Sequence, residues 1–317
     1  MVLGDERGRI LAQAEGGPSN HTEEPGGPER LRSVLRALLK EILNTPSREL
    51  RGRVEWEAAC CGMTGELEIK RRVIRGLLHS RHLSVVHDSV NALEGATVGA
   101  AGIIVIGGTG SVARGRNGKG LELTMGGWGH GFGDEGSGYW IGREVVRAVL
   151  AQWDQMGART RLSSMLLRRL SIQSPYELIR RYYAGTFSRD QLAGLAAWAD
   201  EAAEAGDLVA REILTRAGLE LGRLAKALAK RLFGRPQSKT SPKRHAFSVH
   251  YSGGVFGSAR VLASFTDCVR ASFPTCVVSP PQLSPLLGSL LLAYRSSKVN
   301  VDAVVGSWPG QVKRLAG

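Results

Sequence analysis

The sequence predicts an α/β protein built from two similar units. Three observations indicate this class: strand-like segments alternate with amphipathic helical segments, each unit opens with two strands joined by a turn, and glycine-rich turns follow several strands. We therefore expect a duplicated architecture with a cleft between the units, because ligands of α/β proteins gather at the carboxyl ends of strands.

The first unit opens with a hairpin and a helix. Residues 1–14 read as two extended segments joined by a turn over Gly4–Gly8. A polar loop rich in proline and glycine follows. The next apolar residues have the spacing of one helix face (Leu31, Val34, Leu35, Leu38, Leu39 and Ile42).

Two strand–helix pairs complete this unit. Val54–Cys60 is expected to be a strand that runs into CGMTG, and Glu68–His79 a basic helix. Leu83–His87 is the next strand and Ser89–Gly95 the next helix, which places Asp88 at a strand carboxyl end. From residue types alone, Asp88 is as much a helix N-cap as a general base, and it could be both.

The second unit begins with the apolar strand before GGTGS (Gly107–Ser111). Two more strands and a long helical region follow, with a clean apolar stripe in one of its helices. A strand, helix, strand and helix close the chain (residues 247–251, 258–272, 275–279 and 285–294). We place the domains at residues 1–101 and 102–284, and expect residues 285–317 to pack back on the first domain.

Composition limits the function. The 317 residues are 43% hydrophobic and carry a net charge of +13, which favours anionic ligands such as nucleotides. The basic stretch Lys230–Arg244 has few aromatics, so a solvated loop is preferred to a nucleic-acid site. The four cysteines are not spaced as a metal site, and no apolar run could span a bilayer. We expect reduced thiols, no membrane partner and a cytoplasmic protein.

Two glycine-rich motifs carry the strongest signal, because glycine lets backbone approach a ligand closely. GGTGS could hold phosphate oxygens or be a plain hairpin turn. In GGWGHGFGDEGSGYW (Gly126–Trp140), Trp128 suits the apolar face of a sugar but could be a core aromatic. For Glu135 we prefer a helix-entry carboxylate.

Six segments in order resemble the BadF/BadG/BcrA/BcrD ATPase family, within it the N-acetylglucosamine kinase branch. They cover nearly the whole chain (SNH, VVHDSVNAL, IIVIGGTGS, GGWGHGFGDEGS, YSGGVF and SPLLGSLLLAYR). The resemblance implies the actin-like sugar-kinase fold, in which two ribonuclease-H-like domains close on ATP and substrate. It also implies phosphoryl transfer from ATP, with Mg²⁺, to the C6 hydroxyl of an amino sugar.

The resemblance also implies roles for single residues. Asp88 matches the catalytic base of the family. Four residues match positions that contact the sugar (Asn20, Trp128, Gly129 and Asp134). Six match the nucleotide site (Gly108, Thr109, Gly110, Ser111, Gly253 and Gly254). Near Ala202, where eukaryotic sugar kinases carry a nucleotide-contacting glycine, this chain has alanine, which weakens transfer of detail around the adenine.

One family motif is missing. Members begin with a strand and phosphate loop of the form DGGGTKT, whereas MVLGDERGRILAQAEGG resembles the second strand of that opening hairpin. We expect the first strand and loop to be absent, through a start codon chosen inside a longer gene or through true degeneration. Since one charge-stabilising group is worth about 10²–10³ in rate, we expect the 317-residue chain to have little or no kinase activity.

Two other function classes stay open. One is a degenerate sugar- or nucleotide-binding regulatory protein. The other is an ATP-driven activator of acyl-CoA reductases or dehydratases, which needs cysteines for an iron–sulfur cluster; adjacent Cys60 and Cys61 on an apolar strand argue against it. The sequence fixes neither the acceptor sugar nor the oligomeric state, and a homodimer is possible.

Overall fold

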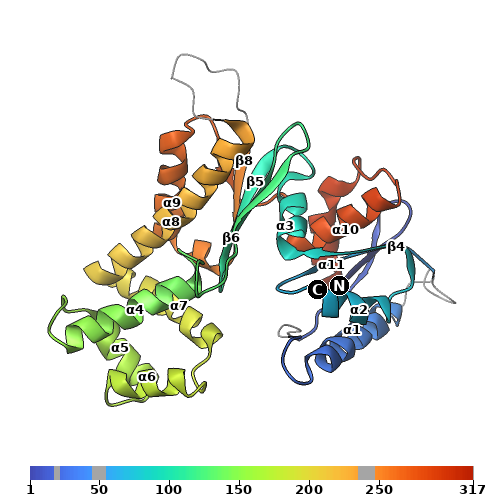
Figure 1. Cartoon of the computed structure of the whole chain (residues 1–317). Coiled ribbons are helices and arrows are strands. Elements are labelled where there is room, and N and C mark those ends of the chain that lie inside the picture. The colour runs from blue at the N-terminus through green and yellow to red at the C-terminus, as the bar shows by residue number, and fades with distance from the viewer. Residues whose placement is uncertain (18–21, 45–54, 235–246, 317) are drawn as a thin grey trace. The chain divides into compact units, whose positions relative to one another are not determined.

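The computed structural model describes residues 1–17, 22–44, 55–234 and 247–316. These residues form two compact units, drawn with their helices and strands in Figure 1. Unit 1 combines Met1–Gly99 with Pro281–Gly317, and unit 2 is Ala100–Pro280. Strands and helices are mixed in both units, which confirms the α/β class.

Unit 1 contains two separate two-stranded sheets. β1 (Val2–Gly4) and β2 (Ile10–Gln13) pair antiparallel, so the predicted opening hairpin is confirmed. β3 (Trp56–Met63) and β4 (Ser80–His87) pair parallel and in register to their last residues. The carboxyl ends of β3 and β4 therefore lie side by side.

Helices from both ends of the chain complete unit 1. α10 packs against α3 and also contacts β1, β3 and β4. A Cβ on Gly288 of α10 would lie 2.1 Å from the Asn91 carbonyl oxygen of α3, so only glycine permits this close helix contact. The helices of unit 1 are α1 (Gly27–Leu43), α2 (Glu68–Arg75), α3 (Asp88–Thr97), α10 (Pro285–Ser296), η3 (Val305–Ser307) and α11 (Trp308–Ala316).

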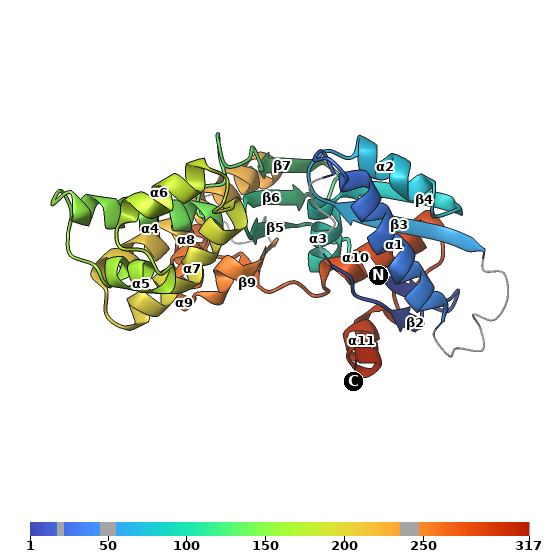
Figure 2. The same cartoon turned by 90° about the horizontal axis from the view of Figure 1, so that it is seen from below.

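Unit 2 is built on a five-stranded sheet in the order β7-β6-β5-β8-β9. β5, β6 and β7 form an antiparallel meander and lie side by side in Figure 2, whereas β8 is parallel to β5 and β9 is parallel to β8. The strands are β5 (Gly102–Gly107), β6 (Ser111–Arg116), β7 (Glu122–Gly126), β8 (Ser248–Ser252) and β9 (Val277–Ser279).

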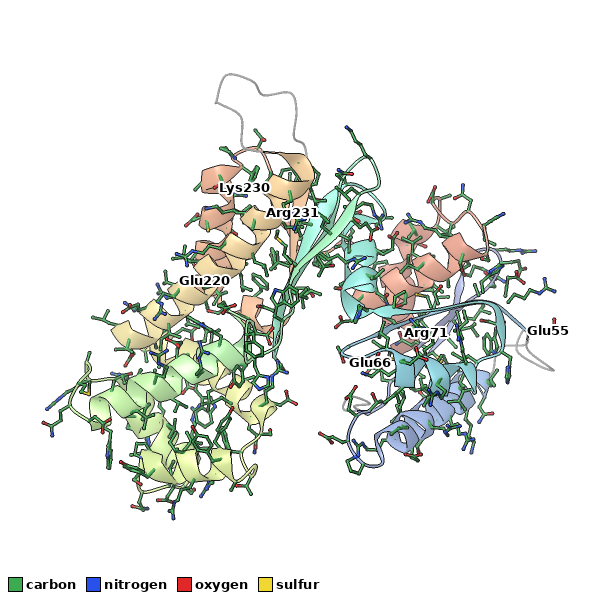
Figure 3. The ribbon with its side chains drawn as sticks, in the orientation of Figure 1. Glu55, Glu66, Arg71, Glu220, Lys230 and Arg231 are labelled. Carbon is green, nitrogen blue, oxygen red and sulfur yellow. The ribbon has the colours of Figure 1, made fainter. Side chains whose placement is uncertain are left out.

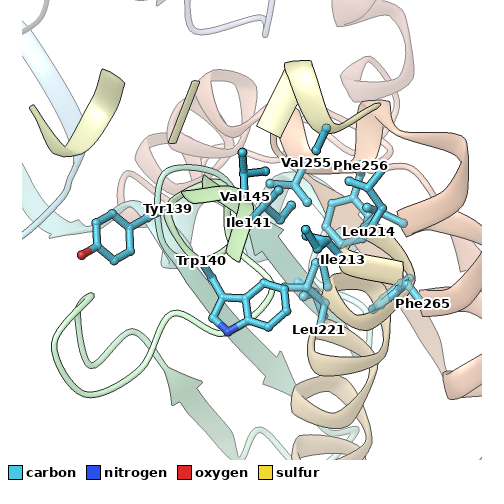
Figure 4. Close-up of a cluster of buried hydrophobic side chains, with 14 of the residues drawn as sticks. Tyr139, Trp140, Ile141, Val145, Ile213, Leu214, Leu221, Val255, Phe256 and Phe265 are labelled. Carbon is cyan, nitrogen blue, oxygen red and sulfur yellow. The ribbon is translucent and has the colours of Figure 1, made fainter. Parts of the chain in front are cut away.

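The predicted helical region forms most of the rest of unit 2. α8 contacts β5, β6 and β7, and its predicted stripe contributes buried Ile213, Ala217, Leu221 and Leu228 to the large core, part of which Figure 4 shows. The helices are α4 (Gly138–Trp153), α5 (Arg161–Arg169), α6 (Pro175–Tyr183), α7 (Arg189–Glu204), α8 (Leu208–Phe233), η2 (Gly254–Gly257) and α9 (Ala259–Ser272).

The structure corrects several predicted boundaries, among them one helix end and one strand start. The helix expected over Glu68–His79 ends at Arg75, because Gly76 is its C-cap and residues from Ser80 onward already belong to β4. The strand expected over residues 275–279 is limited to Val277–Ser279, the segment that pairs with β8. Of the basic stretch Lys230–Arg244, expected to be a loop, residues 230–233 are instead the last residues of α8, and residues 235–244 lie outside the described residues. Of the helices in the described ranges, none is long and apolar enough to cross a bilayer.

Candidate functional site

The motif GGTGS is the turn of the hairpin between β5 and β6. Gly107 and Ser111 form the last register pair of the two strands, and the Gly108 N–H donates to the Gly110 carbonyl at 2.9 Å inside the turn. Within the described residues, no hydrogen bond uses the N–H of Thr109 or Gly110. The hairpin interpretation is therefore right, and the turn still offers two backbone donors to an anionic ligand.

The carbonyl groups of the same turn hold the start of α4. The Gly138 N–H donates to the Gly108 carbonyl at 2.8 Å, and the Tyr139 N–H donates to the Thr109 carbonyl at 3.2 Å. The first N–H groups of a helix have no partner inside the helix, so the turn satisfies two of them. A phosphate near this point would therefore meet the N–H groups of the turn, because these donors of α4 are already used.

A second glycine turn meets the first. Gly253 follows β8 and adopts a φ of 102°. A Cβ on Gly253 would lie 2.4 Å from the Gly107 carbonyl oxygen and 3.1 Å from the Gly108 nitrogen. Because β5 and β8 are parallel, both turns lie at the same carboxyl edge of the sheet, and Gly254 begins η2 beside them.

Asp134 packs against the GGTGS turn and accepts a hydrogen bond from it. Its side chain is buried, and its Oδ1 atom accepts a hydrogen bond from the Ser111 N–H at 3.1 Å. A Cβ on Gly110 would lie 2.9 Å from Asp134 Oδ2, so the turn and the carboxylate are in close contact. The same Oδ2 pairs with Arg189 Nη2 at 2.9 Å. Arg189 is the first residue of α7, and no sequence motif indicated that it belongs to this site.

Trp128 and Gly129 lie in the loop after β7. The Trp128 side chain is 76% exposed, so the alternative of a core aromatic is wrong for this residue. Gly129 has a φ of 80°, and its carbonyl accepts from the Gly133 N–H at 2.9 Å, which closes a tight turn next to Trp128. Trp140, the last residue of the same motif, is instead buried in the core of unit 2.

The structure does not place Glu135 in the first turn of α4, where a helix-entry carboxylate was expected. Ser137 is the N-cap of α4 and its hydroxyl accepts from the Trp140 N–H, whereas Glu135 is exposed and precedes the cap. The Glu135 carbonyl accepts from the Ser111 hydroxyl at 3.0 Å. Ser111, expected in the nucleotide site, therefore uses both its hydroxyl and its N–H to fasten the two motifs together.

Asp88 belongs to unit 1, where it is the first residue of α3 directly after β4. The N-cap of α3 is His87, so the alternative of an Asp88 N-cap is wrong. Burial raises the pKa of the half-buried Asp88 carboxyl group above its ordinary value, although the Ser89 N–H, His87 and Lys70 act in the opposite direction. A raised pKa makes a carboxylate a stronger base.

The remaining expectations concern Asn20 and possible metal ligands. Asn20 lies outside the described residues. Across the described ranges, no three histidine, cysteine, aspartate or glutamate side chains are grouped to hold a metal ion. All four cysteines are free thiols, and burial raises the pKa of Cys60 to about 12 and that of Cys61 to about 11. These values disfavour the thiolate that a cluster ligand must provide.

Comparison with known proteins extends these observations. Residues 1–293 match the BadF/BadG/BcrA/BcrD ATPase family. The N-acetylmuramic acid/N-acetylglucosamine kinase of Clostridium acetobutylicum is 31% identical over 291 residues, which cover 90% of this chain and 91% of the relative. The N-acetyl-D-glucosamine kinase of Dictyostelium discoideum is 30% identical over 279 residues, covering 85% of this chain and 84% of the relative.

Solved structures are similar over the same length. A crystal structure from Chromobacterium violaceum, assigned as an N-acetylglucosamine kinase, superposes with a TM-score of 0.68 at 26% identity, covering 92% of this chain and 93% of that chain. A structure from Porphyromonas gingivalis shares the fold, with a TM-score of 0.66 at 17% identity and coverage of 94% and 95%. The resemblance inferred from the six motifs is thus confirmed.

Proposed function

The chain belongs to the BadF/BadG/BcrA/BcrD ATPase family, and on this basis we propose that it is an ATP-dependent kinase for the 6-hydroxyl of N-acetylglucosamine or a related amino sugar. Both curated relatives are named as kinases of N-acetylated amino sugars. The observation that carries the proposal is the GGTGS turn, which presents two free N–H groups at the sheet edge where Gly253 also lies.

We assign the donor side of the reaction to the glycine turns of unit 2. The N–H groups of Thr109 and Gly110 would hold phosphate oxygens of ATP, and Gly253 with Gly254 would admit the nucleotide close to the backbone. Gly108 and Ser111 keep the turn in shape. Mg²⁺ usually binds through substrate phosphates and waters with few protein carboxylates, so we assign it no protein ligand.

We assign the acceptor side to Trp128, Gly129, Asp134, Asn20 and Asp88. The exposed indole of Trp128 can cover the apolar face of a sugar ring. The Asp134 carboxylate is buried, and we assign to sugar hydroxyl groups the lone pairs that Ser111 and Arg189 leave unused. The Asp88 carboxylate, with its raised pKa, would take the proton from the attacking hydroxyl. Phosphoryl transfer needs little more from a protein than this positioning and charge stabilisation.

The test is an ATP-coupled assay with N-acetylglucosamine, N-acetylmuramic acid, glucosamine and glucose as acceptors. The sequence carries no DGGGTKT motif, so we expect a low rate of transfer. The expected product is the sugar 6-phosphate, identified by phosphorus–carbon coupling in NMR, and Asp88→Asn should remove it. Phosphorylation at another hydroxyl would contradict the assigned position. Sugar binding in calorimetry without any transfer would instead favour the regulatory sugar-binding protein.

A further inference from the structure

Lys70 is a buried cation in a helix whose other basic residues are exposed or half-exposed. It is 2% exposed, whereas Arg72 and Arg75 of the same helix α2 face solvent and Arg71, labelled in Figure 3, is half-exposed. Lysine is almost never fully buried unless it is paired, because removing its charge from water costs free energy. The burial of Lys70 therefore indicates that its ammonium group has specific partners.

The ammonium group of Lys70 connects two loops of unit 1. Its Nζ donates to the Thr64 carbonyl at 2.5 Å, in the turn after β3, and lies 3.8 Å from Glu23 Oε1, in the loop before α1. The Thr22 hydroxyl donates to the same Glu23 oxygen at 3.1 Å. A Cβ on Gly65 would lie 3.4 Å from the Lys70 nitrogen, so the turn is packed against the ammonium group.

These contacts place Lys70 at the strand edge that carries Asp88. Met63 of β3 and His87 of β4 are the last register pair of a parallel sheet, so Thr64 and Asp88 are the next residues at the same edge. Among the described residues, Lys70 and His87 act on the Asp88 carboxyl group in the direction that favours its ionised form, and Glu23 faces Lys70 from the loop before α1.

We propose that Lys70 is a positioning residue for the candidate base Asp88: its ammonium group fixes the Thr64 turn at the strand edge that carries Asp88 and supplies a buried positive charge to this edge. This inference rests on the role proposed for Asp88 in phosphoryl transfer. The charge favours the carboxylate, while desolvation of Asp88 keeps it basic enough to accept a proton. Lys70 itself contacts neither substrate nor reacting atoms in this assignment.

The experiment follows the Asp88 carboxyl group directly by NMR titration of the protein labelled with ¹³C in the aspartate carboxyl groups. The Asp88 signal is identified by its loss in Asp88→Asn. Lys70→Met removes the charge and the hydrogen bond, and Lys70→Gln removes the charge while keeping a donor for Thr64. Arg71→Met is the matched control: it removes from the same helix a positive charge whose ion pair, among the described residues, is with Glu68.

We expect the Asp88 titration to shift to higher pH in both Lys70 variants and to stay in place in Arg71→Met. If Lys70→Met fails to fold, Lys70→Gln alone decides the outcome, with circular dichroism as the check on folding. An unchanged Asp88 titration in a folded Lys70 variant overturns the proposal.

This readout does not depend on turnover. A chain that binds no nucleotide and transfers no phosphate would refute the proposed function, yet the effect of Lys70 on Asp88 would still be measured. In an active chain, the acid limb of the pH–kcat profile should move to higher pH in Lys70→Gln, while KM for the sugar changes by less than about twofold. A purely structural role for Lys70 would not move the acid limb.

Discussion

Arg189 pairs with Asp134 across 55 residues of sequence, with 2.9 Å between Arg189 Nη2 and Asp134 Oδ2. Asp134 is 4% exposed, so the pair compensates a buried carboxylate. The Arg189 guanidinium group also lies 5.7 Å from the centre of the Tyr139 ring. The carboxylate proposed to meet sugar hydroxyls is thus already held in place by Arg189 and by the Ser111 N–H.

Replacing Arg189 with methionine should weaken both the fold and sugar binding. Asp134 would keep its burial but lose its cation, and because Arg189 is partly exposed we expect a loss of about 1–3 kcal/mol in the free energy of unfolding. Urea unfolding and calorimetry with N-acetylglucosamine measure the two effects. The control is Arg169→Met, which breaks an exposed pair with Glu201 and should cost less than about 1 kcal/mol. Equal losses in both variants would contradict a special role for Arg189.

The sequence could predict the strands, the glycine turns and the position of Asp88, because each leaves a local pattern of apolar period or turn residues. It could not predict Arg189 or Lys70. Arg189 is one arginine among many in a helical region, and its partner is far away in the chain. Lys70 lies in a helix with a solvated, basic pattern, and only the fold shows that its side chain turns inward to Thr64.

The sequence also could not predict whether Trp128 is exposed or buried. A tryptophan between glycines is compatible with a core or with a surface, and the tertiary structure alone placed Trp128 in solvent and Trp140 in the core. Likewise, Glu135 looked suited to the start of α4, but Ser137, a residue type preferred at N-caps, takes that place.

Gly110→Ala should disrupt the phosphate-binding turn. The added methyl group would lie 2.9 Å from Asp134 Oδ2, so either the turn or the carboxylate must move. We expect ATP affinity to fall by about tenfold, since backbone donors must be placed accurately to hold phosphate. Titration with a fluorescent ATP analogue measures the effect. Gly118→Ala, in the turn between β6 and β7 with no atom within 4 Å of its Cβ, is the control and should bind as wild type does.

Trp128→Ala should separate binding from stability. An indole that is 76% exposed contributes little to folding, so the free energy of unfolding should change by less than about 0.5 kcal/mol, while sugar affinity falls. Trp140→Ala, which empties a buried site of the same residue type, should cost about 3–5 kcal/mol. Calorimetry and urea unfolding on both variants provide the comparison. Unchanged sugar affinity in Trp128→Ala would remove Trp128 from the proposed acceptor site.

Protonation of Asp88 should control both turnover and stability. Because burial raises the pKa of its carboxyl group, phosphoryl transfer should decline on acidification at a higher pH than an ordinary aspartate would cause, and Asp88→Asn should lower kcat by about 10²–10⁴. These effects are measured as the pH–kcat profile of each protein at saturating ATP and sugar.

The stability effect has a definite sign. A raised pKa means that the folded state binds the Asp88 proton more tightly than the unfolded state, so this contribution is complete below the unfolded pKa and disappears as pH rises through the folded pKa. Asparagine has no such proton. Asp88→Asn should therefore gain stability relative to wild type as pH rises through this window, which urea unfolding across a pH series measures. A constant difference between the two proteins would show that the pKa of Asp88 is the same in both states.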